Sequence, residues 1–412
     1  MVLKSSVTYT PAPADEHRRR RRRILLYSHD GGGLGHLRIT LGVATALAKR
    51  LPDDTILLLT GSNQASAFPH PDNVDFVKLP SMPLRDLYVD LPGSASPPSH
   101  LTQVLYFREQ VAFATIAAFN PDLLVVDHAP VGLFQELARS LAWVEQVAPQ
   151  TRRALLMRDI TFGAEQTKTI WSNEGSLPLL DRFYDRILVY GDQSVFDPVI
   201  EYGMSAEAAA KTVFVGYLTP HAARRSAAEV REELGIGDQR LIAVTVGGGG
   251  DGVDVLRAFV RGFAEHAPAD VSAYVVTGPL LPAADAAEIA ALASGVPRLR
   301  IAAFDADFPA VAETATVLVG MGGYNAMTEA VYCGKRAVTV PRPPGPEEQT
   351  LRAERFGRRG LIREVAHRDL SPETLWAAIA AELENGASLG PEALPFGGEV
   401  RIVDALVALL DG

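Results

Sequence analysis

Short apolar runs alternate with longer stretches of helical periodicity along most of the chain. In the first half, the runs lie at residues 23–29, 55–61, 121–130, 152–159 and 185–192. Nearly every position in a run is apolar, which is typical of strands buried on both faces of a parallel sheet. Amphipathic stretches between the runs, such as residues 37–51, supply helices that cover such a sheet. We therefore predict a doubly wound α/β domain over residues 24–217.

The same pattern begins again after residues 213–225, VFVGYLTPHAARR, which interrupt it with glycine and proline. Five further strand ends follow, at residues 240–252, 272–279, 298–307, 316–325 and 336–343. We predict a second Rossmann-like α/β domain over residues 218–398. The closing residues 399–412 form a last amphipathic helix, which we expect can pack back on the first domain.

Composition restricts the class of protein. Hydrophobic residues make up 47% of the 412 positions and charged residues 21%, as in globular proteins. With 39 basic and 49 acidic residues the net charge is −10, which argues against a nucleic-acid partner. Cys333 is the single cysteine, so we expect a reducing, cytoplasmic location, and the alanine- and arginine-rich usage favours a bacterial source. No apolar run approaches the ~20 residues that span a bilayer.

The N-terminal region contains the basic run HRRRRRR at residues 17–23. A secretory signal would continue into an apolar segment of 7–15 residues, whereas only ILLY precedes the first polar positions. We expect residues 1–23 to be a disordered arm. The run at 18–23 either remains solvated or makes peripheral contact with anionic lipid or a phosphorylated acceptor.

Glycine-rich loops join a strand to a helix in both predicted domains. The first is YSHDGGGLGH at residues 27–36, and the second is GGGGDG at residues 247–252. Backbone N–H groups and the helix dipole converge at such a junction and bind anions such as phosphate. Neither loop is a GxxxxGK[ST] phosphate loop, because no lysine follows. A tight turn alone also explains each loop, but its repetition favours a diphosphate site.

A more specific pattern lies in residues 318–349, LVGMGGYNAMTEAVYCGKRAVTVPRPPGPEEQ. A strand ends at Val319, glycines turn the chain, and a helix begins near Asn325. Glu329 lies one turn into that helix, where its carboxylate can accept from ribose hydroxyls. The segment PGPEEQ then reads as a rigid loop that presents Glu347, Glu348 and Gln349 to the hydroxyls of a sugar.

This segment resembles the donor site of GT-B glycosyltransferases, above all the C-terminal domain of glycosyltransferase family 28. The resemblance covers roughly residues 24–370 and implies two Rossmann-like domains facing each other across a cleft. It implies a nucleotide-diphosphate sugar, such as a UDP-sugar, as co-substrate and no cofactor. By position, Glu329 would bind ribose, Glu348 and Gln349 the donor sugar, and Phe304 would lie near the nucleobase. The residues expected to approach the diphosphate are Gly248, Gly249, Gly322, Gly323 and Asn325.

The first glycine loop resembles the GGH motif of the same family, here written GLGH. In that interpretation Gly33 and Gly35 approach the donor, and His36 is the general base that deprotonates an acceptor hydroxyl. Histidine suits the task because its ordinary pKa, near 6.5, lies close to working pH. His36 is alternatively a residue that only packs or caps at the helix start. Asp127 and His128 end a central strand, where they would orient His36, touch the acceptor or have a structural role.

Two sequence features refine the predicted stereochemistry and the expected need for a metal ion. Retaining GT-B enzymes commonly carry Glu-x7-Glu, but Met321 stands eight residues before Glu329, which favours inversion. Asp305 and Asp307 have the D-x-D spacing of a metal site in GT-A enzymes, whereas in a GT-B fold they end a strand and begin a helix. We therefore expect no metal, and stabilisation of the diphosphate by backbone dipoles.

The sequence thus predicts an inverting, metal-independent glycosyltransferase acting on a small-molecule or lipid-linked acceptor. Residues 91–110, a Pro/Ser-rich loop that enters an aromatic-bearing helix, would form a lid over the acceptor or a plain surface loop. Two other functions fit the same architecture. GLGHLRITLGVA also resembles the G-x-G-H-x-x-R segment of the UDP-sugar hydrolase of pseudaminic acid synthesis, in which His36 would activate water. A non-catalytic nucleotide-sugar binder is the third.

Overall fold

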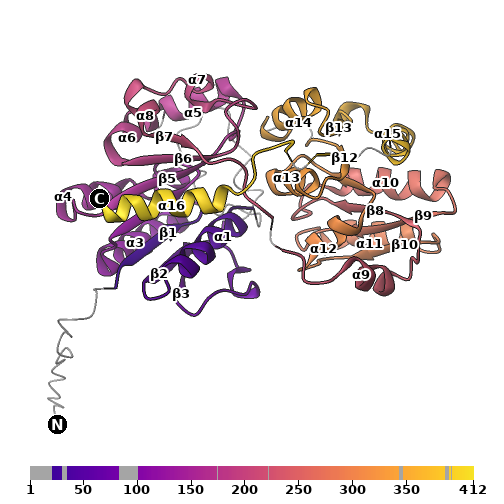
Figure 1. The fold of residues 1–412 in the computed structure, drawn as a ribbon, viewed down its shortest axis with the longest axis horizontal. Helices are drawn as coiled ribbons and strands as arrows, with labels where there is room; N and C mark the ends of the chain where they lie inside the picture. The colour runs from indigo at the N-terminus through magenta and orange to yellow at the C-terminus, as the bar shows by residue number, and fades with distance from the viewer. Residues whose placement is uncertain are drawn as a thin grey trace, which may run out of the picture.

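Two parallel α/β domains stand side by side, as the predicted fold class requires (Figure 1). The computed structural model describes residues 21–29, 35–82, 101–173, 175–220, 222–342, 347–385, 389–390 and 392–412. The basic run up to Arg20 and Gly33 therefore lie outside the described residues, as do residues 91–100 of the predicted lid. The described helices include none long and apolar enough to cross a membrane.

The N-terminal domain has a seven-stranded sheet in the order β3-β2-β1-β4-β5-β6-β7, with every pairing parallel. Its strands are β1 (Arg23–Tyr27), β2 (Thr55–Thr60), β3 (Val74–Lys78), β4 (Leu123–Asp127), β5 (Arg152–Arg158), β6 (Arg186–Tyr190) and β7 (Thr212–Phe214). The central strand β4 is buried at every position, which explains its unbroken apolar run.

Helices cover both faces of this sheet. They are α1 (Gly35–Arg50), α3 (Thr102–Phe119), α4 (Ala138–Val147), α5 (Ala164–Asn173), α6 (Ser176–Phe183), α7 (Pro198–Glu201) and α8 (Ala206–Lys211), with short 3₁₀ turns at Ala65–Ala67 and Leu133–Gln135. Two separate apolar clusters, one containing Leu26 and the other Leu25, form the cores on the two faces.

The C-terminal domain repeats the plan with a six-stranded parallel sheet in the order β10-β9-β8-β11-β12-β13. Its strands are β8 (Arg240–Thr245), β9 (Val271–Val276), β10 (Leu299–Ala302), β11 (Val317–Gly320), β12 (Arg336–Thr339) and β13 (Arg363–Glu364). Its helices are α9 (Ala227–Leu234), α10 (Val253–His266), α11 (Ala283–Ala293), α12 (Phe308–Thr314), α13 (Tyr324–Tyr332), α14 (Glu348–Arg358) and α15 (Pro372–Glu384), with a 3₁₀ turn at His367–Asp369.

The chain crosses between the domains twice, and the two crossings touch. The first follows β7, and the second precedes the last helix, α16 (Gly398–Asp411). Tyr217 N–H donates to the Pro395 carbonyl at 2.8 Å, and Gly398 N–H donates to the Tyr217 carbonyl at 2.9 Å. Helix α16, yellow in Figure 1, then packs on α1 and β5 of the N-terminal domain. Arg22 closes this arrangement with an ion pair to Asp411 near the end of α16.

Each sheet has one point at which its strand order reverses, and this point decides where ligands bind. In open parallel sheets, ligands bind outside the carboxyl ends of the two strands that flank it. In the N-terminal domain these are β1 and β4, and in the C-terminal domain β8 and β11. The second glycine loop follows β8, and Gly35 begins α1, the helix after β1, so both lie at the ligand-binding end of a sheet.

Candidate active site between the domains

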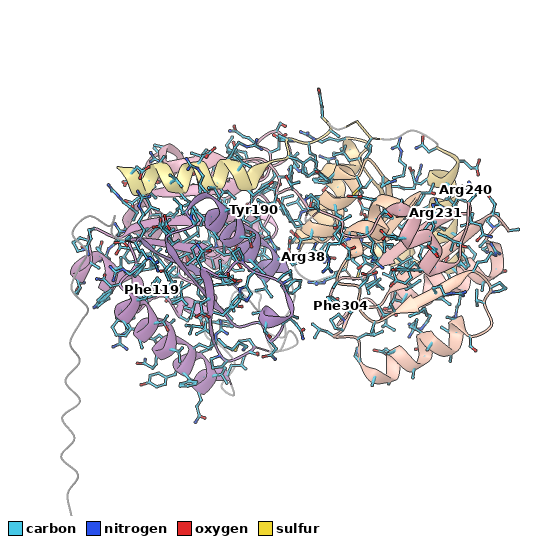
Figure 2. All side chains as sticks on the ribbon, turned by 60° about the horizontal axis from the view of Figure 1, so that its bottom comes forward. Arg38, Phe119, Tyr190, Arg231, Arg240 and Phe304 are labelled. Carbon is cyan, nitrogen blue, oxygen red and sulfur yellow. The ribbon has the colours of Figure 1, made fainter. Side chains whose placement is uncertain are left out.

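A cleft of about 840 Å³ lies between the domains and is lined from both sides. The N-terminal wall comes from α1, the residues that follow β4, the end of β5, and the last turn of α5. The opposite wall comes from residues 245–251, 304–309 and 321–329. Figure 2 shows the labelled side chains of Arg38 and Phe304 where the two halves of the molecule meet. Both reversal points of the sheets therefore open into one cavity.

His36 and Asp127 form a hydrogen-bonded pair on the N-terminal wall. His36 is the second residue of α1, and Asp127 is the last residue of β4. The distance from His36 Nδ1 to Asp127 Oδ2 is 2.7 Å. The Asp127 carboxylate is fully buried, whereas the His36 side chain keeps 18% of its surface exposed. The carboxylate thus orients a ring whose other nitrogen remains available on the cleft side.

Two further donors hold the Asp127 carboxylate in place. Tyr190 O–H donates to Oδ1 at 3.2 Å, and His29 N–H donates to Oδ2 at 3.3 Å. Burial acts to raise the pKa of Asp127, but the charge and hydrogen bond of His36 outweigh it, so the net pKa is lowered. An ionised Asp127 accepts from Nδ1–H of His36, which leaves Nε2 as the basic nitrogen.

Two more histidines surround His36. The ring centroids of His29 and His128 lie 5.3 and 4.8 Å from that of His36, respectively, and both residues line the cleft. Burial, followed by the charge of His36, lowers the pKa of His29 to about 3. Burial and the charges of His29 and His36 lower the pKa of His128 well below its usual value. Both rings are therefore neutral at neutral pH and do not compete with His36 for a proton.

The glycine loop of the C-terminal domain is packed too tightly for side chains. Gly249 has φ +90°, and a Cβ there would lie 2.3 Å from the Thr277 carbonyl oxygen. Gly248 also lines the cleft and lies against Gly278, which has φ +88°. The N–H groups of Gly247 and Gly249 donate within the loop, to Thr245 Oγ1 and the Val246 carbonyl, both at 3.3 Å. The loop therefore brings backbone, without side chains, to the cleft surface, as close approach of a diphosphate requires.

The N-termini of α1 and α13 face each other across the cleft. Helix α13 begins at Tyr324, one residue before the predicted start, with Gly323 as its N-cap. Gly35 opens α1, and a Cβ on it would lie 3.7 Å from Asn325 Nδ2. Gly322, with φ +82°, makes the turn before α13. Two positive helix ends and the Asn325 amide thus converge on one region that suits an anionic group.

Glu329 is a buried carboxylate on α13 that lines the cleft. Its side chain is 4% exposed, and its Oε1 has no hydrogen-bond partner. Arg38 of α1 approaches this oxygen from the other domain, at 3.8 Å. Burial raises the pKa of Glu329, and Arg38 offsets only part of that effect. A buried acceptor without a partner costs folding free energy, so this one suits hydroxyl groups supplied by a ligand.

The predicted loop position of Glu348 and Gln349 is wrong, because both lie in the first turn of α14. Glutamate and glutamine are good helix formers, and acidic groups in a first turn are favoured by the helix dipole. Glu348 Oε1 accepts from Arg158 Nη1 at 3.0 Å and lies 2.9 Å from Arg352 Nη2. Gln349 Oε1 accepts from Arg342 N–H at 3.1 Å. Both residues still line the cleft.

Phe304 and the D-x-D pair have different environments. Phe304 lines the cleft with 46% of its surface exposed, which leaves its ring open to a planar ligand. Asp307 accepts from the backbone N–H groups of Arg224 and Arg225 at 3.0 and 2.9 Å, and Asp305 accepts from the Arg225 guanidinium at 2.8 Å. Both carboxylates thus anchor the segment that links the domains. Across the described parts of the chain, no cluster of histidine, cysteine and acidic residues could hold a metal ion.

The structure brings most of the predicted site residues to this cleft, and it adds three that the sequence did not single out. Arg38 and Arg158 reach across from the N-terminal domain, and His29 completes the histidine group. Arg158 ends β5, a position at which parallel sheets place functional groups, and this was the one available signal. Arg38 and Arg158 pair with Glu329 and Glu348 of the other domain, so these two contacts form only where the domains meet.

Comparison with known proteins finds a family match within the C-terminal domain. Residues 243–395 match the glycosyltransferase family 28 C-terminal domain. Over 93 residues the chain is 30% identical to the UDP-N-acetylglucosamine–N-acetylmuramyl-(pentapeptide) pyrophosphoryl-undecaprenol N-acetylglucosamine transferase of Syntrophotalea carbinolica. That alignment covers 22% of this chain and 26% of the relative, so it spans about a quarter of that protein's length.

Solved structures match over nearly the whole chain. The calicheamicin glycosyltransferase CalG4 superposes with a TM-score of 0.63 at 18% identity, covering 95% of this chain and 99% of that one. The glycosyltransferase of kitacinnamycin gives 0.63 at 16% identity, with 95% and 100% covered. A Listeria monocytogenes protein described as a UDP-N-acetylglucosamine 2-epimerase gives 0.63 at 15% identity, with 95% and 96% covered. At these identities the likeness establishes the fold alone.

The protein therefore has the GT-B fold, with a C-terminal domain of the glycosyltransferase family 28 type. Both parts of the predicted resemblance are confirmed. An epimerase among the structural neighbours shows that this fold serves more than one reaction, so activity must be argued from the site itself.

Proposed function

We propose that this protein transfers a sugar from a UDP-sugar to an acceptor hydroxyl, with inversion and without a metal ion. The observation that carries the proposal is the His36–Asp127 pair, which faces a family 28 donor domain across one 840 Å³ cleft. A base on one wall and a nucleotide-sugar site on the other is the arrangement that direct transfer needs.

The donor would be held by the C-terminal wall. Glu329, whose buried Oε1 has no hydrogen-bond partner, would accept from the ribose hydroxyls. The Gly248–Gly249 backbone and the α13 N-terminus with Asn325 would bind the diphosphate, and the exposed Phe304 ring would lie beside the base. Glu348 and Gln349 would contact the sugar from the first turn of α14.

In the transfer step, His36 Nε2 would take the proton from the acceptor hydroxyl as its oxygen attacks the anomeric carbon. The bond from that carbon to the diphosphate oxygen breaks, and the nucleoside diphosphate leaves with the electron pair. Asp127 stabilises the positive imidazolium that His36 becomes. Met321 lines the cleft at the position where the Glu-x7-Glu pattern of retaining enzymes would place its first glutamate, which supports a single displacement with inversion.

Charge that develops on the leaving diphosphate would be stabilised by the two facing helix N-termini and the glycine loop. Such fixed dipoles act strongly where water is excluded, and they need no reorganisation during the reaction. Asp305 and Asp307 would have no part in metal binding, because Arg225 and the backbone of the linker already occupy them.

The acceptor would be largely apolar. The N-terminal wall around His36 carries a group of apolar side chains, and two neutral histidines lie beside them. These apolar residues are Leu133, Phe134, Phe162, Ile170 and Trp171. A hydroxyl on a hydrophobic small molecule or on a lipid fits this wall, since apolar surface favours apolar ligands.

The experiment has two stages. A thermal-shift screen of nucleotides and nucleotide sugars should find that UDP and a UDP-sugar raise the melting temperature. Incubation of that donor with hydrophobic alcohols and phenols should then give a glycosylated product of inverted anomeric configuration by mass spectrometry and NMR. Free sugar formed at the same rate without acceptor would instead indicate the hydrolase, and unchanged donor would indicate a binding protein.

A further inference from the structure

Helix α14 makes two arginine–glutamate pairs with the N-terminal domain, and they differ in where they lie. Glu348 on the first turn pairs with Arg158 at the end of β5, inside the cleft. Arg355, seven residues later, pairs with Glu201 at 3.3 Å, and neither of these two residues lines the cleft. The Arg158–Glu348 pair is thus a candidate functional contact, and the Arg355–Glu201 pair on the same helix is a structural contact of the same chemistry.

Glu348 is held by arginines from both domains through a single oxygen. Arg158 Nη1 and Arg352 Nη2 lie 3.0 and 2.9 Å from the same atom, Oε1. Among the contacts between described residues, none engages Oε2, and the side chain lines the cleft. The two arginines therefore fix the orientation of the carboxylate and leave one oxygen to accept hydrogen bonds from a ligand.

Arg352 alone cannot fix this carboxylate, because its guanidinium is already shared. Its Nη1 donates to the Gly322 carbonyl at 3.1 Å, and its Nη2 also donates to the Ile160 carbonyl at 3.0 Å. The Arg158 side chain is only 9% exposed and lines the cleft, and it interacts with Tyr190 as well as with Glu348. Its Nε, like that of Arg352, has no hydrogen-bond partner. A buried guanidinium with spare donors beside the cleft is positioned to respond to a ligand.

We propose that recognition of the donor sugar is divided between the two domains, with Arg158 as the positioning residue that holds Glu348 against the sugar hydroxyls. This inference rests on the proposed function, since it assumes a nucleotide sugar in the cleft. The nucleoside part of the donor is bound by the C-terminal domain, and the diphosphate by the glycine loop and the two facing helix N-termini, none of which depends on Arg158. Glu348 is held in position for the sugar only when β5 and α14 lie together and Arg158 contacts it. The affinity for the sugar therefore depends on the closed arrangement of the two domains.

The test separates the nucleotide from the sugar. Calorimetric titrations with UDP and with UDP-N-acetylglucosamine are run on the full chain as wild type, Arg158→Gln, Arg158→Lys and Arg355→Gln. For Arg158→Gln we expect UDP affinity within twofold of wild type, and affinity for UDP-N-acetylglucosamine to fall roughly 10- to 100-fold, the usual loss for a charge-assisted hydrogen bond. Arg158→Lys keeps the charge and should recover part of this loss. Arg355→Gln should bind both ligands as wild type does.

A double-mutant comparison tests the link to Glu348. If Arg158 acts through Glu348, the Arg158→Gln/Glu348→Gln protein should bind UDP-N-acetylglucosamine no worse than the weaker single variant. Additive losses would overturn the proposal.

The remaining outcomes are also decisive. Equal weakening of UDP and UDP-N-acetylglucosamine in Arg158→Gln, or the same loss in Arg355→Gln, would show that Arg158 only joins the domains. Unchanged binding in Arg158→Gln, or no gain of affinity from the sugar in wild type, would also reject the inference while leaving the UDP site intact. Wild type that binds neither ligand would reject the proposed UDP-sugar function together with the inference.

Discussion

His36 and Asp127 lie 91 positions apart in the chain, yet their side chains form a 2.7 Å hydrogen bond. They meet because β1 and β4 are neighbours at the reversal point of the N-terminal sheet, so the helix after one strand begins beside the end of the other. The sheet topology thus places a histidine at the start of α1 beside a buried carboxylate at the end of β4.

Replacing the histidine tests whether this pair does chemistry. We expect His36→Ala to lower kcat by roughly 10²- to 10⁴-fold, the usual contribution of a general base, with donor affinity nearly unchanged. His266→Ala, at the remote end of α10, is the control and should have no effect. Steady-state kinetics with calorimetry of donor binding provide the measurement. A variant that retains most of its turnover would reduce His36 to a helix-start residue.

Replacement by glutamine should change the stability of the free protein in opposite directions at Glu329 and at Glu348. The pKa of Glu329 is raised by burial, so its ionised form costs stability at any pH well above its unfolded value, and Glu329→Gln should stabilise the free protein at pH 8. The pKa of Glu348 is lowered because Arg352 and Arg158 outweigh the effect of burial. Glu348→Gln should therefore destabilise the free protein, by roughly 1–3 kcal/mol.

Urea denaturation and UDP titration of the same two variants give the measurement. If Glu329 binds ribose, Glu329→Gln should lose roughly 10- to 100-fold in UDP affinity despite its greater stability. Unchanged UDP affinity in that variant would contradict the assignment. Glu348→Gln should keep its affinity for UDP, since the donor sugar and not the nucleotide is its proposed ligand.

Asp305 and Asp307 should contribute to the stability of the fold and should not bind a metal ion. Asp307→Ala removes an acceptor from two backbone N–H groups and from the Arg225 guanidinium, and should cost roughly 1–3 kcal/mol of unfolding free energy. Transferase activity should survive EDTA, and Mn²⁺ should not raise the melting temperature of wild type or variant. Activity that EDTA abolishes and Mn²⁺ restores in wild type, but not in Asp307→Ala, would establish a metal site instead.

The sequence predicted the sheets and loops because their signals are local. Strands such as β4 and β8 contain continuous apolar runs, at residues 123–126 and 241–244, and the glycines after β8 mark the turn that follows it. Strands β3, β7 and β13 were missed because they are partly exposed or only two or three residues long, and carry no comparable run. Glu348 was placed on a loop because the prolines before it hid a helix start.

The cross-domain contacts could not be predicted from the sequence. Arg158 and Glu348 are separated by 190 positions. Apart from the place of Arg158 at the end of a strand, no sequence pattern distinguishes Arg158 or Arg38 among the 39 basic residues. Their roles arise only when the domains meet. The donor residues on α13 were found because one short segment contains them all.

The buried histidines should make the protein less stable in mild acid. Because the pKa of His128 in the folded protein lies well below 6.5, only the unfolded chain takes up a proton there as pH falls below 6.5. Stability is therefore lost on acidification, by up to about 1.4 kcal/mol per pH unit for each such histidine.

His128 has φ +69°, a conformation that asparagine tolerates, so His128→Asn removes the titration with little backbone strain. Urea denaturation at pH 7.5 and 5.5 should show a smaller loss in His128→Asn than in wild type, while His266→Ala should behave as wild type does. An equal loss in His128→Asn and wild type would mean that His128 titrates normally, and the neutral wall proposed for the acceptor would then be wrong.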